Sequence, residues 1–343
     1  MKARRFYIIP SLLFVLVLAQ GAWAKTADEP LGIVTGPKTG TYYAFGKDIA
    51  RMAAKSNFKI EIKSSEGSTE NIRRLNSSEN AGLGIVQSDV LGFLSRSKNP
   101  DSVRMAGNLR MVFPFYHEEV HIFGRKSIKN FADLQGLKVA VGEEGSGNLL
   151  TAINLFSMMN VTPSDTIKIS PEKGLVAVLK GELDAVIFVA GKPVRLFKNL
   201  EDFGLPENKR YAAMLEDTHF IPLDDPKILE EYKPADLTHD DYSFIGSPVP
   251  TVSVQAILVS YDFSKNDEKA RCEKIGKLAD IIRNNFSELK ESGHMKWKEV
   301  NLNAKAGGWK RDNCAWQEKP EPTPKKKLNT EEFLNLPIGM RGS

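Results

Sequence analysis

Short apolar strands that alternate with helical segments constrain the fold of this chain most strongly. The segment 31–35 is predicted to be a strand, and a glycine-containing loop leads from it into a helix expected over 41–54. The same order follows twice more, with strands expected at 58–64 and 82–86 and with helices that begin near Ser68 and Val90. Strand, loop and helix repeated in this way predict an α/β fold, in which helices cover a parallel sheet.

A second stretch of the chain repeats this pattern. Strands are expected at 120–124, 137–141, 166–169 and 183–190, and helices at 148–159 and 172–180. A long strand at 251–260 then precedes an amphipathic helix expected over 267–289, which can pack back on the first half. We therefore expect two lobes with a cleft between them. The expected boundaries are 25–126 for the first part of lobe 1, 127–248 for lobe 2, and 249–316 for the return to lobe 1.

The first 24 residues have the pattern of a Sec-type signal peptide. Three basic side chains lie within residues 2–5, residues 6–19 are apolar, and Ala22-Trp23-Ala24 is a small-x-small cleavage pattern. An uncleaved membrane anchor is the alternative, but the apolar run is short for a span of roughly 20 residues. We expect a cleaved signal peptide over residues 1–24 and a periplasmic protein.

The rest of the composition limits the classes of partner. The formal net charge of the chain is +4, and it falls to +1 without the three basic residues of the signal peptide. Basic and acidic side chains are interleaved, which gives no support for nucleic-acid binding. Residues 317–343 begin with a run rich in proline and lysine that cannot bury a core, and they predict a linker and a C-terminal tail.

The chain has two cysteines, Cys272 and Cys314. In an exported protein an even number of cysteines permits a disulfide, and we favour that pairing. Cys272 also shares a predicted helical face with apolar residues, so a small buried thiol is the alternative.

The loop Gly36–Gly40 and the polar residues that end the other strands are candidates for an anion site. A helix N-terminus presents unpaired N–H groups and a partial positive charge, which favour an anion. Ligands of open α/β sheets bind beyond the carboxyl ends of the strands. Polar side chains occupy that place repeatedly: Thr39, Thr41 and Tyr42, then Ser68 and Asn71, then Gln87, then Ser146 with Gly147. Such a set suits a small carboxylate, although each member alone is also a common helix cap.

Two sequence patterns that occur in enzymes are better explained here by structure than by catalysis. Residues 117–121, HEEVH, match the zinc-protease pattern H-E-x-x-H, which requires a helix. The β-branched residues at this point predict a strand, which would separate the two histidines by roughly 13 Å. The Glu143–Glu144 pair is interpreted as a solvated loop. We therefore expect no enzyme, no metal and no cofactor.

Several segments in order resemble the TAXI group of solute-binding proteins of TRAP transporters. They are TGPKTGTYYAFGKDIA (35–50), SSEGSTENIRRLNSSENAGLGIVQSD (64–89), HEEVHIF (117–123), ADLQGLKVAVGEEGSGN (132–148) and LDAVIFVAGKP (183–193). The resemblance covers about 31–260. It implies a type II periplasmic-binding-protein fold, a small carboxylate ligand such as a glutamate-like or 2-oxo acid, and a TRAP-type permease as partner. We expect the protein to be a monomer.

The resemblance also implies a set of ligand contacts and shows where this chain departs from the group. The implied contacts are Thr39, Thr41, Tyr42, Ser68, Asn71, Gln87, Ser146, Gly147, Gly191, Lys192 and Pro193. Pro37-Lys38 stand where the group usually has glycines, and Asn148 stands where a threonine is usual. These departures bear on the identity of the ligand and leave the lobes unchanged.

Two other functions are compatible with the same pattern. One is a periplasmic recognition subunit of a sensor or signalling complex, for which a neighbouring sensor kinase would be the indication. The other is an exported enzyme on a two-lobed fold, which turnover of a trial carboxylate would reveal.

Overall fold

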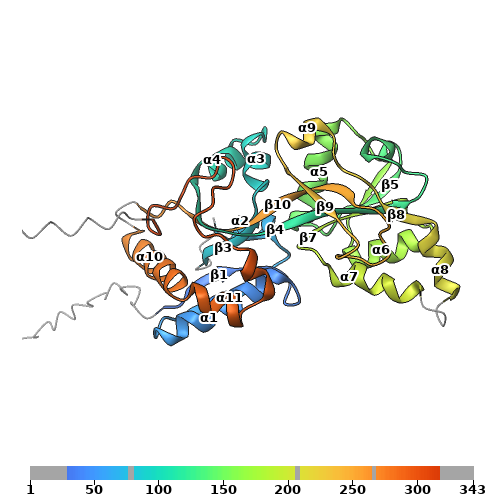
Figure 1. Ribbon diagram of the computed structural model, residues 1–343. Helices are drawn as coiled ribbons and strands as arrows, with labels where there is room; N and C mark the ends of the chain where they lie inside the picture. The colour runs from blue at the N-terminus through green and yellow to red at the C-terminus, as the bar shows by residue number, and fades with distance from the viewer. Residues whose placement is uncertain (1–28, 76–80, 205–208, 265–267, 317–343) are drawn as a thin grey trace, which may run out of the picture.

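The computed structural model describes residues 29–75, 81–204, 209–264 and 268–316. The predicted signal peptide and the predicted tail lie outside these residues. Within them the chain forms a mixed α/β structure of two lobes joined by long strands (Figure 1). The two-lobed α/β fold expected from the sequence is confirmed.

One ten-stranded sheet runs through both lobes in the order β2-β1-β3-β10-β4-β7-β5-β6, with β8 beside β4 and β9 beside β10. Its strands are β1 (Leu31–Val34), β2 (Ile60–Lys63), β3 (Ala81–Gln87), β4 (Leu109–Arg125), β5 (Lys138–Ala140), β6 (Asp165–Ile167), β7 (Ala185–Ala190), β8 (Thr218–Phe220), β9 (Lys233–Leu237) and β10 (Val249–Tyr261). The pairs β1–β2, β1–β3, β5–β6 and β5–β7 are parallel, as the repeated strand, loop and helix order predicts.

The long strands β4 and β10 connect the lobes. They pair antiparallel along most of their length, and β10 also pairs with β3 of lobe 1 while β4 pairs with β7 of lobe 2. The sequence predicted a strand at 120–124 and extended structure at 117–121, whereas β4 begins at Leu109. Pro114 lies beside a shift in register between β4 and β10, which is where a sheet tolerates a residue without an N–H group.

Helices cover both faces of the sheet in each lobe. They are α1 (Thr41–Lys55), α2 (Ser68–Leu75), α3 (Val90–Ser95), α4 (Pro100–Asn108), α5 (Gly147–Met159), α6 (Pro171–Leu179), α7 (Arg195–Lys198), α8 (Lys209–Glu216), α9 (Pro226–Leu229), α10 (Lys269–Asn284) and α11 (Phe286–Ser292), with short 3-10 turns η1 (Phe131–Leu134), η2 (Asn199–Gly204) and η5 (Met295–Glu299). The single helix expected over 267–289 is two helices, α10 and α11. Among the described residues, no helix combines the length and apolarity that a membrane span requires.

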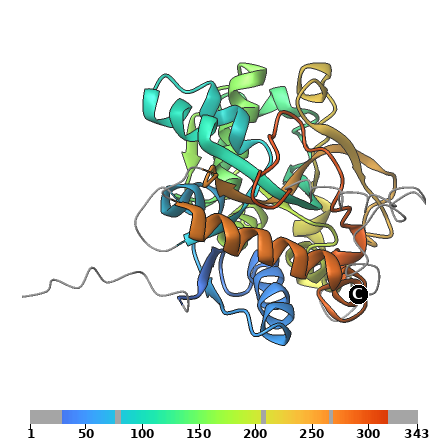
Figure 2. The ribbon, with the colours of Figure 1, turned by 90° about the vertical axis from the view of Figure 1, so that its left-hand side faces the viewer.

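The chain returns to lobe 1 at its C-terminal end. Helix α10 packs beside α1 (Figure 2), and Trp297, Trp309 and Cys314 join the apolar core that Ile33 and Phe45 help to build. Lobe 2 has its own apolar clusters on the two faces of its part of the sheet. Each lobe therefore has a core of its own, and the two crossing strands link these cores.

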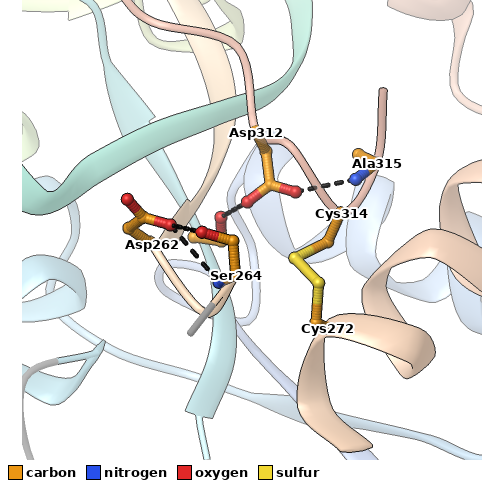
Figure 3. Close-up of a disulfide and its surroundings, with 7 residues drawn as sticks. Asp262, Ser264, Cys272, Asp312, Cys314 and Ala315 are labelled. Carbon is orange, nitrogen blue, oxygen red and sulfur yellow. Dashed lines mark hydrogen bonds between the residues drawn. A yellow bond between two sulfur atoms is a disulfide. The ribbon is translucent and has the colours of Figure 1, made fainter. Parts of the chain in front are cut away.

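A disulfide ties the last described segment to α10 (Figure 3). The sulfur atoms of Cys272 and Cys314 lie 1.95 Å apart, and 42 positions of sequence separate the two residues. Beside it the carboxylate of Asp312 accepts hydrogen bonds from the Ser260 hydroxyl and from the backbone N–H of Ala315. These contacts fix the segment against the end of β10 in lobe 1.

Candidate ligand-binding cavity between the lobes

A cavity of about 660 Å³ lies between the lobes, at the carboxyl ends of the parallel strands. Nine of the eleven predicted contacts line it: Thr39, Thr41, Tyr42, Ser68, Gln87, Ser146, Gly147, Gly191 and Pro193. Asn71 and Lys192 lie outside the lining. The volume is that of a small-molecule site, and both lobes contribute to its wall.

The loop Gly36–Gly40 places the N-terminus of α1 at the cavity. Gly40 is the N-cap, and no side chain accepts a hydrogen bond from the first turn of the helix. The first turn also contains no acidic residue. Free backbone N–H groups and the positive end of the helix dipole therefore face the cavity beside the Thr41 hydroxyl, which favours an anionic group at this point.

Ser68 and Asn71, both on α2, have different roles. Ser68 Oγ accepts a hydrogen bond from the Gln87 N–H at 3.0 Å, and the Ser68 hydroxyl also bonds the Tyr42 hydroxyl beside the cavity. Asn71 is fully buried: its Nδ2 donates to the carbonyl oxygens of Thr35 and Ile85, and its Oδ1 accepts from Ser65 Oγ. Asn71 thus joins α2 to β1 and β3 outside the lining, and its assignment as a ligand contact stays a prediction.

From lobe 2, the N-terminus of α5 approaches lobe 1 closely at Gly147. A Cβ atom on Gly147 would lie 2.0 Å from Gln87 Oε1 and 2.6 Å from Ser68 Oγ, so a larger residue here would displace these two side chains. Ser146 is the N-cap of α5: its Oγ accepts from the Leu149 N–H and donates to the Glu143 carbonyl oxygen. The Ser146 hydroxyl is therefore largely used within lobe 2, although the residue lines the cavity.

The turn after β7 contributes Gly191 and Pro193 to the lining, whereas Lys192 points elsewhere. Lys192 Nζ forms an ion pair with Asp241 at 2.9 Å and a hydrogen bond to the Asp236 carbonyl oxygen. The Lys192 N–H donates to Glu119 Oε2. Lys192 holds the turn against β9 and β4 in lobe 2 and lies outside the lining, and its assignment as a ligand contact stays a prediction.

The floor of the cavity includes Glu118 and Tyr116 of β4, which the sequence analysis did not select. Glu118 Oε2 accepts a hydrogen bond from the Tyr42 hydroxyl at 2.6 Å, and Glu118 Oε1 accepts from the Tyr116 hydroxyl at 3.4 Å. Burial raises the pKa of Glu118 to about 8, despite the opposing effect of the Tyr42 hydrogen bond. A signal was present in the sequence, because a carboxylate within an otherwise buried strand requires a partner.

The H-E-x-x-H pattern forms no metal site. Both histidines lie in β4, as predicted, and His121 makes hydrogen bonds with the Glu119 carbonyl oxygen and the Tyr242 hydroxyl. Burial lowers the pKa of His121 to about 4. No group of three or more His, Cys, Asp or Glu residues suited to a metal ion occurs in the part of the chain that the structure describes.

Comparison with known families identifies the chain. The model of the NMT1-like family matches residues 33–306, which is most of the chain. The chain belongs to the NMT1-like family. The TAXI group within which the sequence analysis placed this NMT1-like protein stays a prediction.

Several solved structures are similar to the chain at low identity. BugD, a periplasmic binding protein, is 12% identical with a TM-score of 0.46, over 80% of this chain and 89% of that chain. MatC from Rhodopseudomonas palustris, solved with bound malate, is 14% identical with a TM-score of 0.42, over 80% and 90%. A histidine kinase sensor domain with similarity to periplasmic binding proteins is 12% identical with a TM-score of 0.44, over 80% and 98%. At these TM-scores nothing about the ligand or partner of the NMT1-like protein follows from them.

Proposed function

We propose that this NMT1-like protein is a periplasmic solute-binding protein, exported by a cleaved signal peptide, that captures a small organic molecule with a carboxylate group. The observation that carries the proposal is the cavity itself. It takes neutral donors from both lobes and the uncapped N-terminus of α1, which together can neutralise a carboxylate without a dedicated arginine. The ligand is released unchanged, since a transport role requires capture and delivery without catalysis.

Closure of the two lobes around the ligand explains why the cavity has two walls. Glu70 N–H donates to the Gly145 carbonyl oxygen and Thr69 Oγ1 donates to the Ser146 carbonyl oxygen, so α2 of lobe 1 and the loop before α5 of lobe 2 are in direct contact. A ligand that contacts both walls favours this closed arrangement by its differential affinity. We infer that the closed form is presented, as a monomer, to a TRAP-type permease.

A thermal-shift screen followed by calorimetric titration tests the binding function. The purified protein is exposed to a panel of mono- and dicarboxylates, 2-oxo acids and amino acids, with ATP and NAD as negative controls. A ligand at a hundredfold excess over its Kd should raise the free energy of unfolding by about 2.7 kcal/mol. Saturable binding of a nucleotide with no response to any carboxylate would overturn the proposal, and turnover of a bound carboxylate would replace it with an enzyme.

The export and delivery steps have tests of their own. The protein recovered from a periplasmic extract should begin at Lys25. Uptake of the identified ligand by vesicles that contain a TRAP-type permease should require this protein, and uptake without it would remove the proposed partnership.

A further inference from the structure

The acid on the floor of the cavity has no positively charged partner. Glu118 is only 6% exposed, and no ion pair reaches it among the residues the structure describes. Its contacts are the hydroxyls of Tyr42 and Tyr116. A buried carboxylate is ordinarily paired with a cation or protonated. Because the described contacts of Glu118 include no cation, Glu118 must either hold a proton or bind a cation that a ligand supplies.

The charged groups packed around Glu118 do not supply that cation. On its own strand Glu119 is acidic, and beyond the end of β3 Asp89 is acidic too; both raise the pKa of Glu118 further. The two lysines that act on the adjoining Glu119 serve other acids, since Lys192 pairs with Asp241 and Lys296 pairs with Glu299 at 2.6 Å. With its pKa raised to about 8, Glu118 is largely protonated at neutral pH, and an approaching cation, which lowers the pKa of a neighbouring carboxyl, would displace that proton.

The charged side chains in the wall of the cavity are mostly negative, as Glu118 is when ionised. Glu66, Glu143 and Glu172 are exposed acidic residues of the lining, against Arg195 as the cation within the described lining. A dianionic ligand would meet repulsion from these carboxylates, whereas a ligand with a positive group would be attracted.

We propose that the cavity selects a ligand with a protonated amino group, which the Glu118 carboxylate binds while the ligand carboxylate lies at the N-terminus of α1. The inference rests on the proposed function and narrows its ligand class to zwitterionic amino acids, as opposed to 2-oxo or 2-hydroxy acids. Tyr42 belongs to the first turn of α1, and its hydroxyl contacts Glu118. The N-terminus of α1 and the Glu118 carboxylate are therefore separated by the length of one tyrosine side chain, a distance that the two charges of a small zwitterion can span. Glu118 is thereby a specificity-determining residue.

Matched ligand pairs test the inference. Calorimetric titration at pH 7.5 compares each amino acid with the 2-hydroxy acid of the same side chain: alanine with lactate, leucine with 2-hydroxyisocaproate, and glutamate with 2-hydroxyglutarate. In any pair that shows binding, the amino acid should bind at least about tenfold more tightly than its 2-hydroxy acid, as expected for one charge-assisted hydrogen bond. Glu118→Gln should abolish this preference, and the exposed Glu61→Gln, which changes the charge equally outside the cavity, should preserve it.

The pH dependence gives a second readout that needs no variant. Affinity for the amino acid should rise between pH 6 and 8.5, because Glu118 must lose its proton to bind an ammonium group. Affinity that rises as the pH falls would show that Glu118 donates a proton to an acid, and would overturn the inference. Hydroxy acids that bind as tightly as amino acids would also overturn it and leave the proposed function intact, whereas no binding by any member of the panel would count against both.

Discussion

At the scale of single residues, Ser68 lies in the cavity lining where a hydrogen-bond donor to the ligand is expected. Its hydroxyl bonds the Gln87 N–H and the Tyr42 hydroxyl, so we expect a ligand oxygen to replace Tyr42 as the acceptor of the Ser68 proton. Ser68→Ala should remove one charge-assisted hydrogen bond, worth about 1.5–3 kcal/mol, and weaken binding about ten- to a hundredfold. Calorimetric titration with the best ligand of the screen measures this change.

The matched control for that variant is Ser56→Ala, which removes a hydroxyl from an exposed residue at the end of α1, outside the cavity. Its affinity should equal that of the wild type. Equal affinities for the wild type and Ser68→Ala would remove Ser68 from the site.

Glu118 should also govern the pH dependence of stability in the ligand-free protein. Burial raises its pKa from the ordinary 4.5 to about 8, so between these values the folded state binds a proton that the unfolded state does not. The free energy of unfolding must therefore fall as the pH rises through this window. We use pH 6.5–8, which lies above the pKa values of about 6 for Asp89 and about 4 for His121.

Urea unfolding of the wild type and Glu118→Gln at pH 6.5 and 8 tests this expectation. The wild type should lose stability across the interval, by up to about 1.4 kcal/mol for each pH unit over which Glu118 alone titrates. The glutamine variant should lose much less. An equal loss in both proteins would show that the Glu118 pKa is not raised in solution.

Residue types alone could not separate ligand contacts from structural contacts in this cavity. Ser68, Asn71 and Ser146 all follow strands at the predicted edge of the sheet, but Asn71 joins three elements and Ser146 caps α5. The difference lies in hydrogen-bond partners that are distant in sequence. Glu118 was missed for the same reason, because its partner Tyr42 is 76 positions away.

At the scale of elements, the Cys272–Cys314 disulfide fixes the last described segment to α10. Its 42-residue separation should stabilise the folded state by roughly 2–4 kcal/mol, largely by restricting the unfolded chain. The double variant Cys272→Ser/Cys314→Ser should therefore unfold at a lower denaturant concentration than the oxidised wild type. Ligand affinity should change little, since neither cysteine lines the cavity.

A thiol assay decides whether the bond exists in the purified protein. Unreduced, denatured wild type should show no reactive thiol. Reaction of both cysteines under these conditions would favour the small buried thiols that the sequence left as the alternative.

The elements with a strong local pattern were predictable, and those that depend on distant pairing were not. The bounds expected for α1 and α5 agree with the structure to within one residue, because apolar spacing and glycine loops mark their ends. The first part of β4 was missed because Pro114 argues locally against a strand, whereas pairing with β10 holds it in the sheet. The last helix is divided at Asn285, which caps both α10 and α11 and whose Nδ2 donates to the Ile281 carbonyl oxygen.

At the scale of the whole molecule, a second set of contacts between the lobes lies outside the cavity lining. Asp89, beyond the end of β3, accepts hydrogen bonds from Thr151 of α5 at 2.7 Å and from the Tyr232 hydroxyl at 3.0 Å. An ion pair between Arg96 and Glu231 adds a contact between the same lobes. These groups lie outside the cavity lining, and because they join the two lobes we expect them to contribute to the free energy of closure.

Tyr232→Phe tests that coupling. The variant keeps the ring and removes a hydroxyl that donates to Asp89 and accepts from Asn154 Nδ2. If the open form dominates without ligand, the loss of about 1 kcal/mol from the closed form should weaken ligand binding about fivefold with the lining unchanged. Tyr43→Phe, at a tyrosine outside the lining, is the control and should bind as the wild type does. An unchanged affinity for Tyr232→Phe would mean that Asp89 and Tyr232 stay together in the open form, and that the contacts at the cavity alone govern closure.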